Sequence, residues 1–280
     1  MAVNRDFGLV GVLGWPVAHS RSPVLHNYWI AEHGLAGRYL PLAVPPTELA
    51  TALKGLVALG FRGCNVTTPH KQAVLPFLAE VEPMARRIGA VNTVVVRADG
   101  TLAGFNNDGR GFVQSLRDEA PAWRADAGPI VVLGAGGAAR AVLAALQEEG
   151  AREIRLVNRT YETARALAAE FGAGIVAEHW ERRNDALAGA ATLVNCTNQG
   201  MVGHPALAIA LDALPPEALV ADLIYTPPST PLLTAAKERG HVVVNGLGLL
   251  LNQARPAFAA WFGVTPAISP GLRRAIEATF

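Results

Sequence analysis

The chain has 280 residues, of which 51% are hydrophobic and 17% charged, so it can bury folded cores and is not expected to be disordered. Its 24 lysines and arginines nearly balance 23 aspartates and glutamates, and the sequence has no basic stripe, which argues against a nucleic-acid partner. Cys64 and Cys196 lie far apart without metal-ligand spacing, which excludes a disulfide framework and a zinc site. The start lacks the pattern of a signal peptide, and no apolar run reaches about eighteen residues, so we expect a cytoplasmic protein with no membrane partner.

Short Val-, Ile- and Leu-rich runs in the first hundred residues alternate with segments whose apolar residues recur at helical spacing. This pattern is typical of βα units on a parallel sheet. The predicted strands are 7–14, 38–44 and 61–67, and the predicted helices are 22–34, 47–60 and a segment from Pro69 onward. Residues 91–105 instead predict a β-hairpin, because two extended runs flank the turn dipeptide Asp99-Gly100.

A second βα series begins at residue 129, after a short segment rich in Pro, Gly and polar residues (120–129) that we take as the domain boundary region. Its predicted strands are 130–134, 154–158, 192–196, 219–225 and 241–246, and its predicted helices are 138–149, 161–171 and 231–239. Thr230 is expected to cap the last of these helices, with Pro231 in its first turn. Two further helices, 248–262 and 270–280, follow without another strand. The fold class is therefore α/β, with a mixed N-terminal domain and a doubly wound, Rossmann-type second domain.

The segment VVLGAGGAARAVLAAL (131–146) places a Gly-rich turn directly between a predicted strand and a predicted helix. Gly134, Gly136 and Ala139 occupy the positions of the G-x-G-x-x-G/A dinucleotide fingerprint, which serve the tight turn, the approach of a pyrophosphate and close helix packing. The helix amino terminus supplies N–H donors for phosphates. A plain tight turn is the alternative, and the strand–turn–helix context favours a cofactor site. The loop residues expected to bind the cofactor are Gly134, Ala135, Gly136, Gly137 and Ala138.

The strand after this loop ends in Asn158, Arg159 and Thr160, where NAD-binding folds carry an acidic residue for the ribose 2′-hydroxyl. A carboxylate there would repel a 2′-phosphate, whereas a guanidinium gives it a charge-assisted hydrogen bond. The sequence therefore predicts NADP rather than NAD as the cofactor. The alternative, that Arg159 is a solvated residue at a strand end, stays open.

Polar residues also follow the strands of the first domain. Ser20 and Ser22 stand at a strand-to-helix junction, where they could cap the helix or bind a carboxylate, and the residues alone favour neither role. Asn65, Thr67 and Lys71 are expected at the carboxyl end of a strand, where open α/β sheets bind ligands. A lysine beside a cleft can transfer a proton.

Other polar residues have weaker individual signals. Asn92 and Asp108 lie among glycines that allow close backbone approach, although each could be a turn or cap residue. His19 could act as an acid, but packing or capping is favoured for a histidine at a helix start. Cys64 and Cys196 are expected to be buried as small hydrophobic side chains.

Together these segments resemble the shikimate dehydrogenase family, in order and over almost the whole chain. The matching segments are GWPVAHSRSPVLHN (14–27), NVTTPHK (65–71), GAVNT (89–93), GAGGAAR (134–140), NRT (158–160), NCTNQGM (195–201), DLIYTPPSTPLL (222–233) and GLGLLLNQA (246–254). The resemblance implies NADPH-dependent reduction of the C3 ketone of 3-dehydroshikimate to shikimate, in aromatic amino-acid biosynthesis.

The resemblance also implies roles for individual residues. Lys71 and Asp108 would form the catalytic pair, and Ser20 and Ser22 would hold the substrate carboxylate. The residues implied to line the ring hydroxyls are Thr67, Asn92, Asp108 and Gln253, and those implied to lie by the nicotinamide and substrate are Tyr225 and Gly246. The last helices would return to the first domain. The substrate domain would then comprise 1–108 and 248–280, the NADP domain 109–247, and the active site would lie in the cleft between them.

Three positions depart from the family pattern. Asn107 stands where Thr is usual, so a hydrogen bond can be kept while a methyl group is lost. Thr163 replaces a frequent second arginine, which weakens the expected NADP preference unless Arg165 compensates, and Leu249 replaces Met at similar volume. A quinate or bifunctional quinate/shikimate dehydrogenase is the nearest alternative, and a non-catalytic NADP-sensing module is a remote one. The sequence does not distinguish a monomer from a homodimer.

Overall fold

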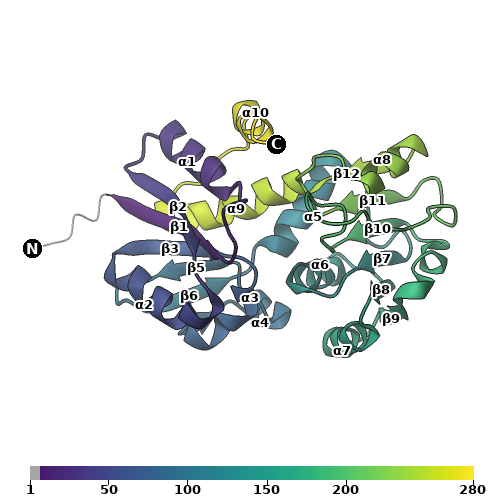
Figure 1. The fold of residues 1–280 in the computed structure, drawn as a ribbon, viewed down its shortest axis with the longest axis horizontal. Coiled ribbons are helices and arrows are strands. Elements are labelled where there is room, and N and C mark those ends of the chain that lie inside the picture. The colour runs from purple at the N-terminus through teal and green to yellow at the C-terminus, as the bar shows by residue number, and fades with distance from the viewer. Residues whose placement is uncertain (1–6) are drawn as a thin grey trace, which may run out of the picture. The chain divides into compact units, whose positions relative to one another are not determined.

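The computed structural model describes residues 7–280, which fold into two compact units (Figure 1). The first unit comprises the chain up to Asn107 together with Leu251–Thr279, and the second comprises Asp108–Leu250 with Phe280. Each unit is built on one six-stranded sheet with helices packed against it, which confirms the predicted α/β class. The expectation of no signal peptide rests partly on residues 1–6, which lie outside the described residues.

The first sheet has the strand order β2-β1-β3-β5-β6-β4. Its strands are β1 (Gly8–Gly14), β2 (Gly37–Ala43), β3 (Phe61–Val66), β4 (Glu80–Val81), β5 (Thr93–Val96) and β6 (Leu102–Phe105). β1 pairs in parallel with β2 and β3, whereas β5 is antiparallel to both β3 and β6. β5 and β6 thus form the predicted hairpin, and the sheet is mixed.

Helices flank this sheet, and their apolar faces close the core of the first unit. They are α1 (Ser22–Glu32), α2 (Leu49–Ala58), α3 (His70–Ala73), α4 (Pro83–Ile88), α10 (Pro270–Glu277), the later part of α9 (Gly246–Phe262), and the 3₁₀ segments η1 (Pro46–Glu48) and η2 (Leu75–Phe77). Leu13 of β1 is paired with Val66 of β3 in the strand register, so the two side chains face the same side of the sheet. On that side they pack with Leu53 of α2 in one buried cluster.

The second sheet is parallel throughout and has the order β12-β11-β10-β7-β8-β9. Its strands are β7 (Ile130–Leu133), β8 (Ile154–Asn158), β9 (Ile175–His179), β10 (Thr192–Asn195), β11 (Leu219–Asp222) and β12 (Val242–Val244). Its helical segments are α5 (Asp108–Glu119), α6 (Gly137–Glu148), α7 (Tyr161–Phe171), η3 (Trp180–Arg182), η4 (Asp185–Leu187), α8 (Pro231–Glu238) and the start of α9. The order reverses at β7 and β10, as expected for a doubly wound fold.

Both faces of the second sheet are buried, which explains the continuous apolar runs of its strands. Val132 packs in one core cluster, whereas its neighbours Val131 and Leu133 pack in another. Thr230 caps α8 as predicted, since its Oγ1 accepts a hydrogen bond of 3.3 Å from the backbone N–H of Leu233.

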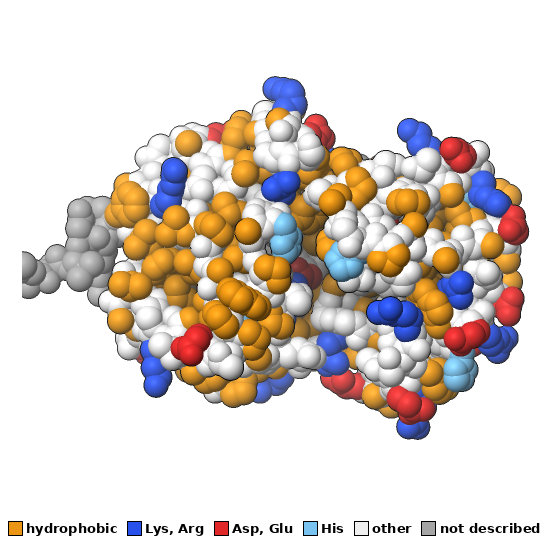
Figure 2. All heavy atoms as spheres, in the orientation of Figure 1, with side chains coloured by type: hydrophobic (Ala, Val, Ile, Leu, Met, Phe, Trp, Pro, Cys, Tyr) orange, Lys and Arg blue, Asp and Glu red, His pale blue; other side chains and the backbone are white. Residues whose placement is uncertain are grey.

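On the face drawn in Figure 2, acidic and basic side chains are interspersed, with no continuous basic area. Within residues 7–280, no helix combines the length and the apolar character needed to cross a membrane. The same part of the chain contains no cluster of His, Cys, Asp and Glu side chains suited to hold a metal ion.

Candidate functional site

Polar segments meet at the ends of several strands of the first sheet, where β1, β3 and β6 end and β5 begins. We call this end of the sheet the polar edge. The strand register pairs Asn65 with Thr93, and Thr93 with Phe105. Short backbone bonds join the following segments: Thr67 N–H donates to Leu13 O at 2.9 Å, and Val91 N–H donates to Lys71 O at 2.8 Å. The topology therefore brings together segments that are separated by up to about ninety positions in the sequence.

The two serines lie after β1 at this edge. α1 starts at Ser22 with Arg21 as N-cap, and the cap makes no side-chain hydrogen bond. An N-cap role for Ser22 is therefore wrong. Ser20 Oγ accepts a long bond of 3.3 Å from the Ser22 N–H. Ser22 is buried, and its side chain hydrogen-bonds with Tyr39, whereas Ser20 is half-buried. Carboxylate binding by the two serines stays a prediction.

Lys71 is half-buried and belongs to the short helix α3, directly after the strand-end segment that carries Thr67. The neighbouring His70 is buried, and its Nε2 lies 2.7 Å from Val44 O. His70 therefore fixes the segment to the end of β2. His19, which belongs to the first motif, is exposed. Burial raises the pKa of the Cys64 thiol to about 12, in agreement with a packing role.

Asn92 and Gln253 come from distant parts of the chain and contact each other within the first unit. Asn92 Nδ2 donates to Gln253 Oε1 at 3.2 Å, and the two side chains are 2% and 7% exposed. Gln253 lies on α9, so this helix contributes to the polar edge. Two of the residues implied for ring hydroxyls are thus brought side by side.

Asn65 links this edge to an aromatic cluster that the sequence analysis missed. Its Oδ1 accepts a bond of 2.7 Å from Tyr39 Oη, and its Nδ2 donates to Asn92 O and Thr93 Oγ1 at 3.0 and 3.2 Å. His26 stacks on Tyr39 at a centroid distance of 4.2 Å. No local signal could identify this group, because its members come from α1, β2, β3 and α9.

His26 is completely buried among rings, and neither ring nitrogen has a hydrogen-bond partner within the described residues. The surrounding aromatic side chains are Trp29, Tyr39, Phe258 and Trp261. Burial lowers the pKa of His26 to about 3, since this environment does not solvate an imidazolium. His26 is therefore a neutral packing residue.

The Gly-rich turn of the second unit has the geometry expected of a phosphate loop. Gly134 has φ +98°, and its N–H donates to Val157 O at 2.8 Å. Gly136 precedes α6 and no side chain caps that helix, while an added Cβ at Gly136 would meet no atom within 4 Å. Ala139 is completely buried. Open space over uncapped N–H groups at a helix start suits a pyrophosphate, so these residues fit a dinucleotide.

The end of β8 offers one unengaged guanidinium beside this loop. Arg159 is exposed and makes no ion pair within the described residues. Arg165 forms an ion pair of 2.7 Å with Glu162, so its guanidinium is already engaged and is not a second cation available to a phosphate. Asn158 Nδ2 donates to Thr160 O at 2.9 Å, which orders the turn that carries Arg159.

Asp222, another residue that the sequence analysis did not single out, joins the carboxyl ends of β10 and β11. Its carboxylate accepts from Asn195 Nδ2 at 3.0 Å, Thr230 Oγ1 at 2.7 Å and Ile224 N at 3.1 Å. Burial raises its pKa despite these bonds. The network fixes the start of the segment that carries Tyr225, whose side chain is half-buried. Only its spacing before Tyr225 in the matching motif could have indicated this role.

Gly246, expected near the nicotinamide, has a packing reason to be glycine. An added Cβ would lie 2.0 Å from Leu223 O, and the Gly246 N–H donates to Ile224 O at 3.0 Å. α9 can begin against this segment only without a side chain. Cys196 directly follows β10 and is half-buried, so the expectation of full burial is wrong for this cysteine. Desolvation raises the pKa of its thiol.

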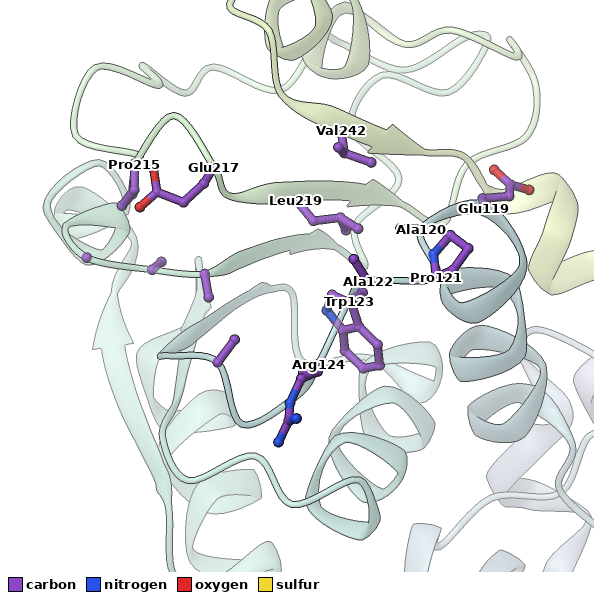
Figure 3. A pocket seen from close by; sticks show the side chains of 14 residues that line it. Glu119, Ala120, Pro121, Ala122, Trp123, Arg124, Pro215, Glu217, Leu219 and Val242 are labelled. Atoms are coloured by element: carbon purple, nitrogen blue, oxygen red, sulfur yellow. The ribbon is translucent and has the colours of Figure 1, made fainter.

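A pocket of about 520 Å³ lies on the second unit (Figure 3). Its lining includes Trp123, Leu219 and Val242, and it opens where β10, β11 and β12 begin. Because all strands of this sheet are parallel, the pocket is at their amino ends and the loop after β7 is at their carboxyl ends. The pocket is therefore separate from the candidate cofactor site.

Family models match both units. Residues 12–94 match the substrate binding domain of shikimate dehydrogenase, and residues 121–203 match the shikimate / quinate 5-dehydrogenase model. Among curated relatives, shikimate dehydrogenase (NADP(+)) of Paramagnetospirillum magneticum is 52% identical over 95% of this chain and 96% of that protein. The protein of the same name from Paracoccus denitrificans is 50% identical over 96% of each chain.

Solved structures share the fold over nearly the full length. Shikimate 5-dehydrogenase from Thermus thermophilus, in complex with NADP(H) and shikimate, has a TM-score of 0.86 and 40% identity, with 98% of this chain and 100% of that chain covered. Quinate dehydrogenase from Corynebacterium glutamicum, in complex with NAD, has a TM-score of 0.89 and 33% identity, with 98% and 99% covered. Similar backbones thus occur in proteins named for different substrates and cofactors.

Proposed function

The chain belongs to the shikimate dehydrogenase family, and from this premise we propose that it catalyses the reversible, NADP-dependent reduction of 3-dehydroshikimate to shikimate. The observation that carries the proposal is 52% identity, over 95% of the chain, to a relative named for this activity. The quinate dehydrogenase of similar fold is only 33% identical. The activity belongs to the biosynthesis of aromatic amino acids, and we place the enzyme in the cytoplasm.

The first unit would bind the substrate at the polar edge of its sheet. Ser20 and Ser22 are proposed to hold the carboxylate, and Thr67, Asn92 and Gln253 the ring hydroxyls. The buried contact of Asn92 with Gln253 supports this division, because two fixed amides can recognise adjacent hydroxyl groups. Quinate carries an extra hydroxyl on the carboxylate-bearing carbon, so the intact serine pair favours shikimate.

The second unit would bind the cofactor. The residues proposed for this are Gly134, Ala135, Gly136, Gly137, Ala138, Asn158, Arg159 and Thr160, with Tyr225 and Gly246 by the nicotinamide end. The uncapped start of α6 suits the pyrophosphate, and the unpaired Arg159 suits a 2′-phosphate. Bound NADPH supplies the hydride for the ketone carbon.

Lys71 and Asp108 would carry out the proton transfer to the ketone oxygen. As the ketone is reduced, negative charge develops on its oxygen, and the Lys71 ammonium stabilises that charge and delivers a proton to it. The Asp108 carboxylate would orient the ammonium, and it would also accept a hydrogen bond from a substrate hydroxyl. Placing both reactants in one site contributes up to ~7–11 kcal/mol, and a positioned acid adds roughly 10²–10⁴-fold.

Absorbance at 340 nm tests the proposal when the purified chain is mixed with shikimate or quinate and with NADP⁺ or NAD⁺. We expect the highest kcat/KM for shikimate with NADP⁺. A higher value for quinate with NAD⁺ would assign the chain to the quinate enzymes. No absorbance change in any combination would favour an NADP-sensing module.

A further inference from the structure

Thr93 lies at the centre of a buried hydrogen-bond network in the first unit, and it is only 1% exposed. Its Oγ1 accepts from Asn65 Nδ2 at 3.2 Å and from Asn107 Nδ2 at 3.1 Å, and it lies 2.8 Å from Asn92 Oδ1. A hydroxyl has one proton and two acceptor lone pairs. Because two amide donors occupy both lone pairs, the hydroxyl proton of Thr93 must point to Asn92.

This arrangement fixes which way the Asn92 carboxamide faces. Its Oδ1 accepts from Thr93 Oγ1 and, at 3.0 Å, from the backbone N–H of Asn107. A flipped amide would put its NH₂ group against two donors, which is unfavourable. The NH₂ group therefore faces Gln253, whose Oε1 accepts from it. Because Oε1 of Gln253 is the end that accepts from Asn92, its NH₂ group (Nε2) is the end left to donate to another partner.

Asn107 enters this network twice, through its backbone N–H to Asn92 and its side chain to Thr93. It is 5% exposed, and it directly precedes Asp108. Asn107 stands where Thr is usual, and its carboxamide makes a specific contact by donating a hydrogen bond to the Thr93 hydroxyl.

We propose that Thr93 and Asn107 are positioning residues that hold the NH₂ groups of Asn92 and Gln253 toward the substrate. This inference rests on the proposed function, in which both amides contact ring hydroxyls. The site then recognises a substrate oxygen by its lone pairs. A hydroxyl that accepts from Asn92 must donate its own proton elsewhere, and a carboxylate such as Asp108 can only accept.

Two substitutions at Thr93 test the role of its hydroxyl. Thr93→Val keeps the shape but removes the proton that orients Asn92, and we expect the KM for shikimate to rise about five- to tenfold. The KM for NADP⁺ should stay unchanged. Thr93→Ser keeps the hydroxyl and should return the shikimate KM to within about twofold of the wild-type value. A merely structural role would lower the midpoint of urea unfolding in Thr93→Val without moving either KM, and that result would overturn the inference.

A double-mutant cycle provides a test that does not depend on how well Thr93→Val folds. Asn107→Ala should raise the KM for shikimate about fivefold in the wild-type background, and less than about twofold when Asn92 is already Ala. Asn106→Ala is the matched control, since Asn106 is also buried and donates to Ala90 O at 2.9 Å. Its effect should be the same in both backgrounds.

The outcomes separate the two claims. A normal shikimate KM in Asn92→Ala would contradict the substrate role of Asn92 in the proposed function, and the inference with it. A raised KM in Asn92→Ala, together with equal effects of Asn107→Ala in both backgrounds, would overturn the inference alone.

Discussion

Lys71 is proposed to transfer the proton. It lies on α3, shortly after β3, where its backbone carbonyl accepts a hydrogen bond from Val91. We expect Lys71→Ala to lower kcat by about 10²–10⁴-fold, because a positioned acid contributes that much, while the KM for shikimate changes little. Steady-state rates at saturating NADP⁺ measure both constants. Lys54→Ala is the matched control, since Lys54 is an exposed lysine on α2 and should leave kcat unchanged. Near-normal turnover in Lys71→Ala would remove the lysine from the mechanism.

Arg159 is proposed to select NADP over NAD. Arg159→Asp replaces an unpaired guanidinium with a carboxylate that repels a 2′-phosphate, so the KM for NADPH should rise by about tenfold or more while that for NADH changes much less. Initial rates with each reduced cofactor provide the comparison. Arg165→Asp serves as the control, because Arg165 is already paired with Glu162. Equal effects of Arg159→Asp on both cofactors would leave the arginine without a role in selection.

Motifs predicted much of the candidate site at the residue scale, but not the partners that orient it. Lys71, Asn92 and Gln253 stand in recognisable segments, and the structure joins two of them by a hydrogen bond. Tyr39 and Asp222 escaped because their roles exist only after distant strands pair. A side chain that acts on another side chain leaves no spacing pattern in the sequence.

Substitution of two glycines at the starts of helices α6 and α9 should have different effects, on cofactor binding in one case and on stability in the other. A methyl group at Gly136 meets no atom, so Gly136→Ala should change the free energy of unfolding by less than about 1 kcal/mol while raising the KM for NADP⁺. At Gly246 the methyl group would collide with Leu223 O, so Gly246→Ala should cost about 1–3 kcal/mol of unfolding free energy.

Urea unfolding of both variants, with cofactor titration of the folded enzyme, measures these effects. The pair controls for the substitution itself, since both variants exchange Gly for Ala at a helix start. An unchanged KM for NADP⁺ in Gly136→Ala would contradict a pyrophosphate at this loop.

Packing of α1 and α9 around His26 makes the first unit sensitive to acid. The unfolded chain binds a proton at His26 near pH 6.5, whereas the folded chain does so only near pH 3. This contribution to stability is therefore complete above pH 6.5 and is lost as the pH falls toward 3, by up to about 1.4 kcal/mol per pH unit.

His26→Phe should remove this dependence while keeping a ring stacked on Tyr39. Urea unfolding at pH 7.5, 6 and 5 compares the two proteins, with His33→Gln as the control because His33 is exposed. Parallel pH profiles for the wild type and His26→Phe would show that His26 is not the acid-sensitive group.

Elements with strong periodicity were predictable, and those decided by tertiary contacts were not. The strands β7, β8 and β10, the helix α7 and the β5–β6 hairpin begin and end within two residues of the predicted ranges. The helix α5 was missed, because its sequence contains two glycines in the first four residues. One of them, Gly109, has Ala141 O only 2.6 Å from where a Cβ would be, so close packing on α6 explains the glycine.

Edge position explains another missed element. The strand β9 is a five-residue edge strand with exposed Val176 and few alternating apolar positions, and it escaped for that reason.

The fold of the whole molecule does not determine its substrate. The quinate dehydrogenase and a 5-ketofructose reductase from Gluconobacter share it with TM-scores of 0.89 and 0.86, at 33% and 34% identity. We therefore expect side chains to set the substrate and the cofactor, with Ser22 and Arg159 as the proposed determinants, because one backbone can carry many combinations of side chains.

A crystal structure of the enzyme with shikimate and NADP⁺ tests the proposed mechanism most directly, because the two proposed catalytic residues belong to different units. We expect Lys71 Nζ and an Asp108 carboxylate oxygen within about 2.6–3.2 Å of the reacting hydroxyl or of its neighbour on the ring. A complex in which the substrate binds elsewhere, with neither group in reach of it, would contradict the account.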